Sequence, residues 1–178
     1  MTEEAKYKYL IKLYKNNIYT YSVYMLRNRM DAEDVTQEVM IRIWKNINEF
    51  NPLAAKAWIM KTTHNLCIDF LRKRSNSANK EVSIDEQFED TFSSGSSEPD
   101  ELLDLKNLDE KIKLAIRNLP QNLKSVFVLY EIQNMKYKEI SKALDIPLNS
   151  VKVYILRARK RLQEELKAHI HSGVTSNE

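Results

Sequence analysis

Residues 136–162, KYKEISKALDIPLNSVKVYILRARKRL, restrict the possible folds of this chain more than any other stretch. Their pattern predicts a short helix, a tight turn and a second helix rich in basic residues. At about 100° per residue, one narrow stripe of the second helix is apolar and suited to burial. That stripe consists of Val151, Ile155, Ala158 and Leu162. The opposite side carries Asn149, Lys152, Val153, Leu156, Arg157 and Lys160.

The two sides of this helix indicate a buried anchor and a surface for a negatively charged partner. The segment holds eight basic and two acidic residues. Such a combination is typical of a helix-turn-helix, whose second helix enters the major groove of DNA. The alternative is a solvated basic face on an ordinary core helix, as charged runs often are. Turn spacing, apolar stripe and charge agree with one another, and this agreement favours DNA binding.

Composition indicates an all-α protein. The 178 residues include only two glycines and four prolines, whereas β-rich folds need many turn residues. No apolar run approaches the roughly 20 residues of a membrane span, and the N-terminus is too charged for a secretory signal. The one cysteine, Cys67, cannot form an internal disulfide, which favours a reducing compartment. We therefore expect a cytoplasmic helical protein without membrane insertion.

The distribution of charge and apolar residues predicts two small helical domains. Long helices are expected over 3–29, from an N-cap at Asp31 to about 47, and over 58–74. Residues 80–110 carry eleven acidic and two basic side chains, and we expect a flexible acidic linker around them. Helicity returns near 102, and Pro120 suits the start of another helix, which ends near Asn134. The expected units are a domain at 1–75, a linker at 76–105, a four-helix domain with the helix-turn-helix at 106–170, and a disordered tail at 171–178.

The helix expected over 58–74 has a mixed polar stripe beside its core face. The stripe contains Trp58, Lys61, Asn65, Asp69 and Arg72. Amides and cations read base edges and bind phosphates, and an aromatic ring can stack on an unpaired base. The alternative is a surface helix with an Asp69–Arg72 ion pair and a core Trp58. These residues alone do not decide between the two interpretations.

The helix expected over 31–47 has an acidic edge instead. It contains Asp31, Glu33, Asp34, Gln37 and Glu38, and it is too acidic to touch DNA. The edge is either a docking surface for a basic protein or simply solvated, and charge alone favours the solvated alternative.

Enzyme chemistry has little support in this sequence. His64, His169 and His171 are not spaced with Cys67 or carboxylates as a metal site requires. Neither a glycine-rich phosphate loop nor a nucleophile elbow is present. Cys67 lies on an apolar helix face, which favours an inert core thiol. We expect no catalytic residue, no metal and no cofactor.

Two ordered stretches carry a family resemblance. DAEDVTQEVMIRIWKNI, followed by AWIMKTTHNLCIDFLRKR, resembles the region of bacterial sigma factors that binds core RNA polymerase and melts promoters. NLPQNLKSVFVLYEIQNMKYKEISKALDIPLNSVKVYILRARKRL resembles their C-terminal promoter-binding domain. The short two-domain layout is similar to the extracytoplasmic-function (ECF) group. The resemblance implies a sigma factor that directs core polymerase to specific promoters and assists melting during transcription initiation.

The resemblance also assigns expected roles to residues. The acidic helix would dock on the clamp helices of the polymerase beta-prime subunit through Asp34, Gln37, Glu38 and Arg42. The minus-ten promoter element would be bound and melted by Phe50, Trp58, Lys61, Asn65, Asp69, Arg72, Lys73 and Arg74. Duplex at the minus-thirty-five element would be read by Asn149, Ser150, Lys152, Val153, Leu156, Arg157 and Lys160. An anti-sigma factor is a further expected partner.

Several positions depart from the family pattern. The loop NPLAAKA lacks the glycine and second aromatic that are common before the tryptophan. Ser141 stands where alanine is usual, and Lys136 where a serine or threonine cap is usual. The alternative function is a self-sufficient helix-turn-helix regulator that does not bind core polymerase; a phosphoreceiver domain would need strands, and residues 1–74 show no strand pattern. A helical scaffold without a nucleic-acid role is a third possibility.

Overall fold

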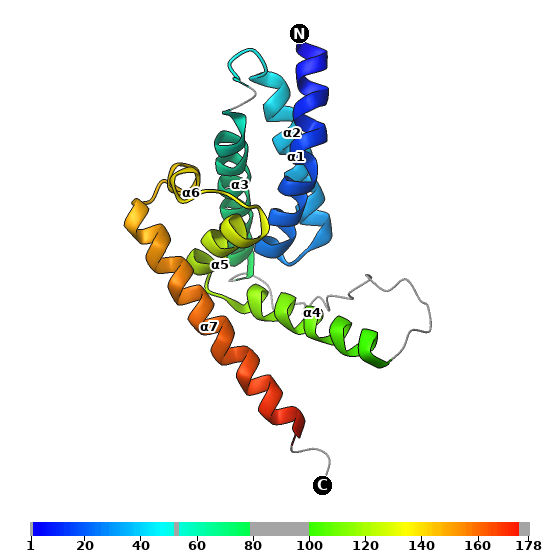
Figure 1. Cartoon of the computed structure of the whole chain (residues 1–178). Coiled ribbons are helices and arrows are strands. Elements are labelled where there is room, and N and C mark those ends of the chain that lie inside the picture. The colour runs from blue at the N-terminus through cyan, green and yellow to red at the C-terminus, as the bar shows by residue number, and fades with distance from the viewer. Residues whose placement is uncertain (1, 52–53, 79–99, 175–178) are drawn as a thin grey trace.

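The computed structural model describes residues 2–51, 54–78 and 100–174, and every regular element in these ranges is a helix (Figure 1). The all-α prediction is therefore confirmed. The elements are α1 (Glu3–Leu26), α2 (Arg29–Lys45), α3 (Ala55–Ala78), α4 (Asp100–Asn118), α5 (Gln121–Phe127), the π-helical turn η1 (Val128–Ile132), α6 (Tyr137–Leu144) and α7 (Leu148–Val174). We call α1–α3 the N-terminal module and α4–α7 the C-terminal module.

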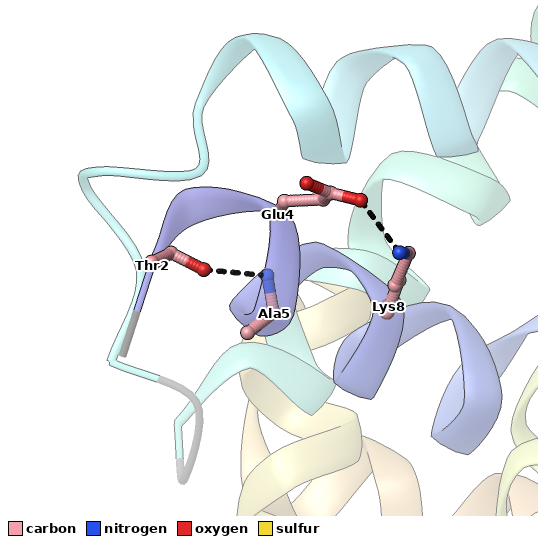
Figure 2. Close-up of polar contacts among 4 residues, drawn as sticks. All are labelled: Thr2, Glu4, Ala5 and Lys8. Atoms are coloured by element: carbon pink, nitrogen blue, oxygen red, sulfur yellow. Dashed lines mark hydrogen bonds and ion pairs between the residues drawn. The ribbon is translucent and has the colours of Figure 1, made fainter.

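The N-terminal module is a three-helix unit in which α1 packs on both α2 and α3. At the start of α1, Thr2 Oγ1 accepts a hydrogen bond from the Ala5 N–H at 3.2 Å (Figure 2). One turn later, Lys8 and Glu4 form an i,i+4 ion pair on the same exposed end. The apolar stripes of the three helices meet in a core that includes Leu10, Ile18, Val35, Val39, Ile43, Ile59 and Cys67.

The start of α2 differs from the sequence prediction, which placed the N-cap at Asp31. Asn28 is the cap: its Oδ1 accepts from the Asp31 N–H at 3.0 Å, and α2 begins at Arg29. The prediction was wrong because asparagine caps as well as aspartate does, and Arg27 already leaves the α1 helix with a left-handed φ of 55°. Asp31 instead lies in the first turn, where a carboxylate favours the positive end of the helix dipole.

The C-terminal module contains the helix-turn-helix as α6 and α7. Asn134 has a left-handed φ of 51°, as expected for the residue that ends the preceding helix. The stripe predicted for burial on α7 is buried in full, with Val151, Ile155, Ala158 and Leu162 each less than 10 % exposed. Helical backbone covers both ends of the range expected to be a linker, because α3 continues to Ala78 and α4 begins at Asp100. Residues 79–99 and 175–178 lie outside the described residues.

The two modules pack against each other. Helix α6 lies against α3, while α4, α5 and η1 contact α1 (Figure 1). The buried residues of both modules form one continuous apolar cluster. Polar groups also bridge the modules: the Arg27 guanidinium donates to the Arg117 carbonyl and to Asn118 Oδ1. The far ends of α4 and α7 diverge from this junction (Figure 1).

Candidate nucleic-acid interface

The exposed face of α7 is a basic surface with two apolar side chains. Leu156 is 69 % exposed and Val153 41 % exposed, although both are large hydrophobic residues. Exposed polar and basic neighbours on the same helix are Asn149, Lys152, Arg157 and Lys160, and Ser150 is half-buried. Isolated apolar groups among cations suit a DNA groove, where they can contact thymine methyl groups. All seven residues expected to read duplex thus lie on one described helix.

The turn between α6 and α7 holds this helix in place. Asp145 adopts a left-handed φ of 55° at the end of α6. Ser141 Oγ donates to the Ile146 carbonyl at 2.6 Å, and the Ile146 N–H donates to the Ser141 carbonyl at 3.2 Å. The serine that departs from the family pattern therefore closes the turn from both its side chain and its backbone. At the other end of α6, the Glu139 carboxylate accepts from the Lys136 N–H at 2.7 Å, which is one half of a capping box. The Lys136 side chain cannot supply the other half, because an ammonium group has no hydrogen-bond acceptor.

A second anchor of α7 was missed by the sequence prediction. Arg159 Nε and Nη2 both donate to Glu131 Oε1, at 2.9 and 2.6 Å, which ties α7 to η1. The same guanidinium carbon lies 5.5 Å from the centre of the Tyr130 ring, and that ring packs on Tyr137. Sequence periodicity does not reveal this cluster, because the charge on Arg159 resembles the charges of its DNA-facing neighbours.

Helix α3 carries the polar stripe expected at the minus-ten element. Asn65 and Arg72 are exposed, and Trp58, Lys61 and Asp69 are half-buried. Arg72 Nη2 lies 3.0 Å from Asp69 Oδ1, so the ion pair proposed as the structural alternative does form. It is solvent-exposed and contributes little to stability, so it does not compete strongly with a phosphate for Arg72.

Two aromatic residues meet at the N-terminal end of α3. The rings of Phe50 and Trp58 are 4.6 Å apart at 71°, an edge-to-face pair that is half-buried against the core. The loop and the helix therefore bring together both aromatics expected at the melting site. At the other end, Lys73 and Arg74 are exposed, and Arg74 Nη1 also donates to the Leu26 carbonyl at 3.4 Å and lies 4.0 Å from Asp31 Oδ2.

The outer face of α2 combines acid with exposed apolar surface. Asp34 and Gln37 are exposed, and Glu38 is half-buried and accepts from Arg42 Nε at 2.8 Å. On the same side of the helix lie Met30, Ile41 and Trp44, which are 76, 47 and 46 % exposed. The sequence prediction missed these three, although their spacing places them on the helical face of Asp34. Exposed apolar groups beside carboxylates indicate a protein-docking face more strongly than acid alone does.

The half-buried His64 and the buried Cys67 of α3 both contact side chains of α1. His64 Nδ1 and Tyr21 Oη are 2.8 Å apart, and burial lowers the His64 pKa to about 4. Burial raises the pKa of the Cys67 thiol to about 12, so the thiolate is not populated near neutral pH. Among the residues that the structure describes, no cluster of three or more His, Cys, Asp or Glu side chains could hold a metal ion. In the same ranges no helix is long and apolar enough to cross a bilayer.

The fold and these surfaces define a two-module helical protein with a DNA-binding helix-turn-helix. Residues 10–77 match the model of Sigma-70 region 2, and residues 109–162 match that of Sigma-70 region 4. The chain is 31 % identical over 164 residues to the ECF RNA polymerase sigma factor SigW of Bacillus subtilis, covering 89 % of this chain and 87 % of SigW. It is 28 % identical to SigM of the same organism, covering 86 % of this chain and 91 % of SigM. This chain belongs to the ECF sigma factors.

Two further comparisons bear on length and fold. The chain is 26 % identical to the ECF sigma factor SigE of Mycolicibacterium smegmatis but spans only 61 % of that relative. Among solved structures, it matches the sigma factor RpoE in the complex with the anti-sigma factor NepR from Bartonella quintana. The TM-score is 0.72 at 21 % identity, over 90 % of this chain and 96 % of RpoE. That similarity supports the shared fold.

Proposed function

We propose that this chain binds core RNA polymerase, directs it to specific promoters and assists promoter melting, without catalysis of its own. The observation that carries the proposal is the ordered pair of Sigma-70 regions. Most of the side chains expected to contact DNA or polymerase are exposed, and the others are half-buried. The proposed units remain 1–75, 76–105, 106–170 and 171–178. The proposed setting is the cytoplasm, where the polymerase works.

The C-terminal module is proposed to bind duplex DNA at the minus-thirty-five element. Lys152, Arg157 and Lys160 would neutralise phosphates, which makes binding sensitive to salt through counterion release. Asn149 and Ser150 can hydrogen-bond to base edges, and Val153 and Leu156 can contact thymine methyl groups. The residues that anchor α7 in the core are on its opposite, buried side, so DNA can bind the exposed face without disturbing the core packing.

The N-terminal module is proposed to hold the melted minus-ten element. Unstacking a base costs a few kcal/mol, and binding of the extruded base must offset this cost. The Phe50–Trp58 pair offers an aromatic platform, and Lys61 and Asn65 lie further along α3. Asp69 pairs with Arg72, and Arg72, Lys73 and Arg74 provide the basic end that would contact the backbone.

The outer face of α2 is proposed to dock on the beta-prime clamp helices. Asp34, Gln37, Glu38 and Arg42 form its polar part, and Met30, Ile41 and Trp44 add apolar area that docking would remove from water. An anti-sigma factor is a further proposed partner, since two structurally similar sigma factors were solved with one: RpoE with NepR, and CnrH with the cytosolic domain of CnrY.

Paired charge variants test whether the two surfaces have separate partners. Lys152→Ala plus Arg157→Ala should weaken promoter binding at least tenfold, roughly 1.4 kcal/mol, and leave polymerase affinity intact. Asp34→Arg plus Glu38→Arg should do the reverse. The control for the acidic pair is Glu4→Arg plus Glu110→Arg, which makes the same change in net charge as the α2 variant but on exposed residues of α1 and α4. Pull-down with core polymerase and salt titration of promoter binding measure both affinities.

The same experiment separates the proposal from its alternative. A self-sufficient regulator would bind promoter DNA tightly without core polymerase, and its α2 variants would show no defect. If the acidic variant binds core polymerase as well as the control does, the docking assignment of α2 is wrong.

A further inference from the structure

The ammonium group of Lys124, on α5, is buried without an acceptor. The residue is only 6 % exposed, although a lysine is almost never fully buried unless it is paired. In the described part of the chain, no oxygen atom accepts a hydrogen bond from its Nζ atom. Its backbone is satisfied, since the N–H donates to the Pro120 carbonyl at 2.8 Å. A buried cation without a counter-ion is costly, so this position favours a negatively charged ligand.

Arg27, directly after α1, is a second cation near this position. Its Nη2 atom donates to the Arg117 carbonyl and, at 3.3 Å, to Asn118 Oδ1, and these bonds hold the guanidinium against the end of α4. Both bonds use one of its three nitrogens, so among the described residues Nε and Nη1 keep donors for a ligand. Burial and the positive charge of Arg27 lower the pKa of the Lys124 ammonium to about 8. The two cations therefore lie close enough to repel each other.

Positive charge from α3 lies at the same end of α1. Arg74 Nη1 donates to the Leu26 carbonyl at 3.4 Å, one residue before Arg27. A carboxylate partner of Arg74 is Asp31, whose Oδ2 lies 4.0 Å from Arg74 Nη1, at the outer limit of an ion pair. Cations from α3, from α5 and from the connection after α1 thus gather around residues 26 and 27. Such a concentration of one sign of charge beside a low-dielectric core attracts counter-ions.

The burial of Lys124 restricts the class of ligand. A DNA duplex or a folded protein surface is too large to reach an ammonium on a residue that is 6 % exposed, whereas a small ion can. The ammonium offers three N–H donors, and the guanidinium offers a planar fork of donors. A tetrahedral oxyanion presents an acceptor oxygen to each of these groups at once, and such charge-assisted hydrogen bonds are strong.

We propose that Lys124 and Arg27 form a binding site for a small oxyanion, either free phosphate or the terminal phosphate group of a nucleotide. The oxyanion accepts from Lys124 Nζ and from the unused donors of Arg27, so a repulsion between two cations is replaced by two attractions. Neither residue belongs to the surfaces proposed to bind DNA or polymerase, so the inference does not rest on the proposed function.

Thermal unfolding tests the site without an assay of transcription. The midpoint of unfolding of the full chain is followed by calorimetry at pH 7, while sodium phosphate replaces sodium chloride at constant ionic strength. A ligand that binds only the folded state raises this midpoint by a few degrees at about ten times its Kd. The wild-type chain should show such a rise, and the rise should saturate. An added series with ADP distinguishes the two sources: a lower Kd for ADP assigns the site to a nucleotide, and an equal or higher one assigns it to free phosphate.

Variants separate binding from the general stabilisation of proteins by phosphate, which does not depend on a particular lysine. Lys124→Met and Arg27→Gln each remove one cation of the site and should lose most of the rise. Lys124→Met relieves a buried charge and should be at least as stable as wild type in chloride, so its lost response cannot come from misfolding. Lys111→Met, at an exposed lysine of α4, is the matched control and should keep the full rise. The site is overturned if the wild-type midpoint rises no more in phosphate than in chloride, or if Lys124→Met or Arg27→Gln responds to phosphate as the control does.

Discussion

Lys124 is a charged residue in an unfavourable place. It lies on α5 beside Arg27 of α1 and is only 6 % exposed. Burial, together with the positive charge of Arg27, lowers the pKa of its ammonium to about 8. The ordinary lysine pKa is about 10.4, so below pH 8 the folded chain holds a buried charge at its full cost.

The pH dependence of stability follows from this shift. Between about pH 8 and 10.4 the unfolded state keeps a proton that the folded state has released, so the Lys124 contribution to stability rises with pH in that window. Lys124→Met should raise the midpoint of thermal unfolding by a few degrees at pH 7. Its advantage over wild type should shrink towards pH 10. A constant difference from pH 7 to pH 10, measured by calorimetry, would show that the ammonium is not the cause.

Substitution of Leu156 tests whether the exposed face of α7 contacts DNA. Because it is 69 % exposed, Leu156→Ala should change the free energy of unfolding by less than about 0.5 kcal/mol. Loss of a thymine-methyl contact should weaken promoter binding about threefold to tenfold. Leu114→Ala, at an exposed leucine of α4, is the control and should bind as wild type does. Equal affinities for the two variants in fluorescence anisotropy would remove Leu156 from the interface.

At the level of secondary-structure elements, the spacing of apolar residues predicted which face of α7 is buried and which is exposed. The buried stripe of α7 and its exposed basic face follow from spacing alone. The apolar part of the α2 face was missed because Met30, Ile41 and Trp44 look like core residues until their exposure is known. The start of α2 was missed because Asn28 and Asp31 are both good caps, and only the hydrogen bond distinguishes them.

The two candidate caps of α2 can be distinguished by mutation. Asn28→Ala should lower the free energy of unfolding by about 1 kcal/mol, because the Asp31 N–H loses its acceptor. Asp31→Ala removes a favourable charge near the helix dipole and a long, solvent-exposed ion pair with Arg74, and should cost about half as much or less. Urea unfolding of both variants gives the comparison. If Asp31→Ala lowers the free energy of unfolding more than Asn28→Ala does, Asp31 is the cap after all.

At the scale of the whole molecule, the packing of the modules could not be predicted from the sequence. Gln133 and Asn17, whose side chains form a hydrogen bond between the modules, are 116 residues apart, and nothing local to either one signals the other. The two-module plan was predictable because each module has its own periodic helices, with an acidic stretch between them. Their docking combines one continuous apolar cluster with a few long-range polar contacts, and the spacing of residues along the sequence does not reveal which surfaces of the two modules meet.

Transcription in vitro distinguishes an initiation factor from a protein that only binds DNA. Core polymerase is incubated with genomic template, with and without this chain, and the 5′ ends of the RNA are sequenced. We expect a set of discrete new start sites that appear only with the chain and share sequence elements about 10 and 35 base pairs upstream. These starts should vanish with Asp34→Arg plus Glu38→Arg. Start sites identical to those of core polymerase alone would contradict the assignment of this chain as an initiation factor.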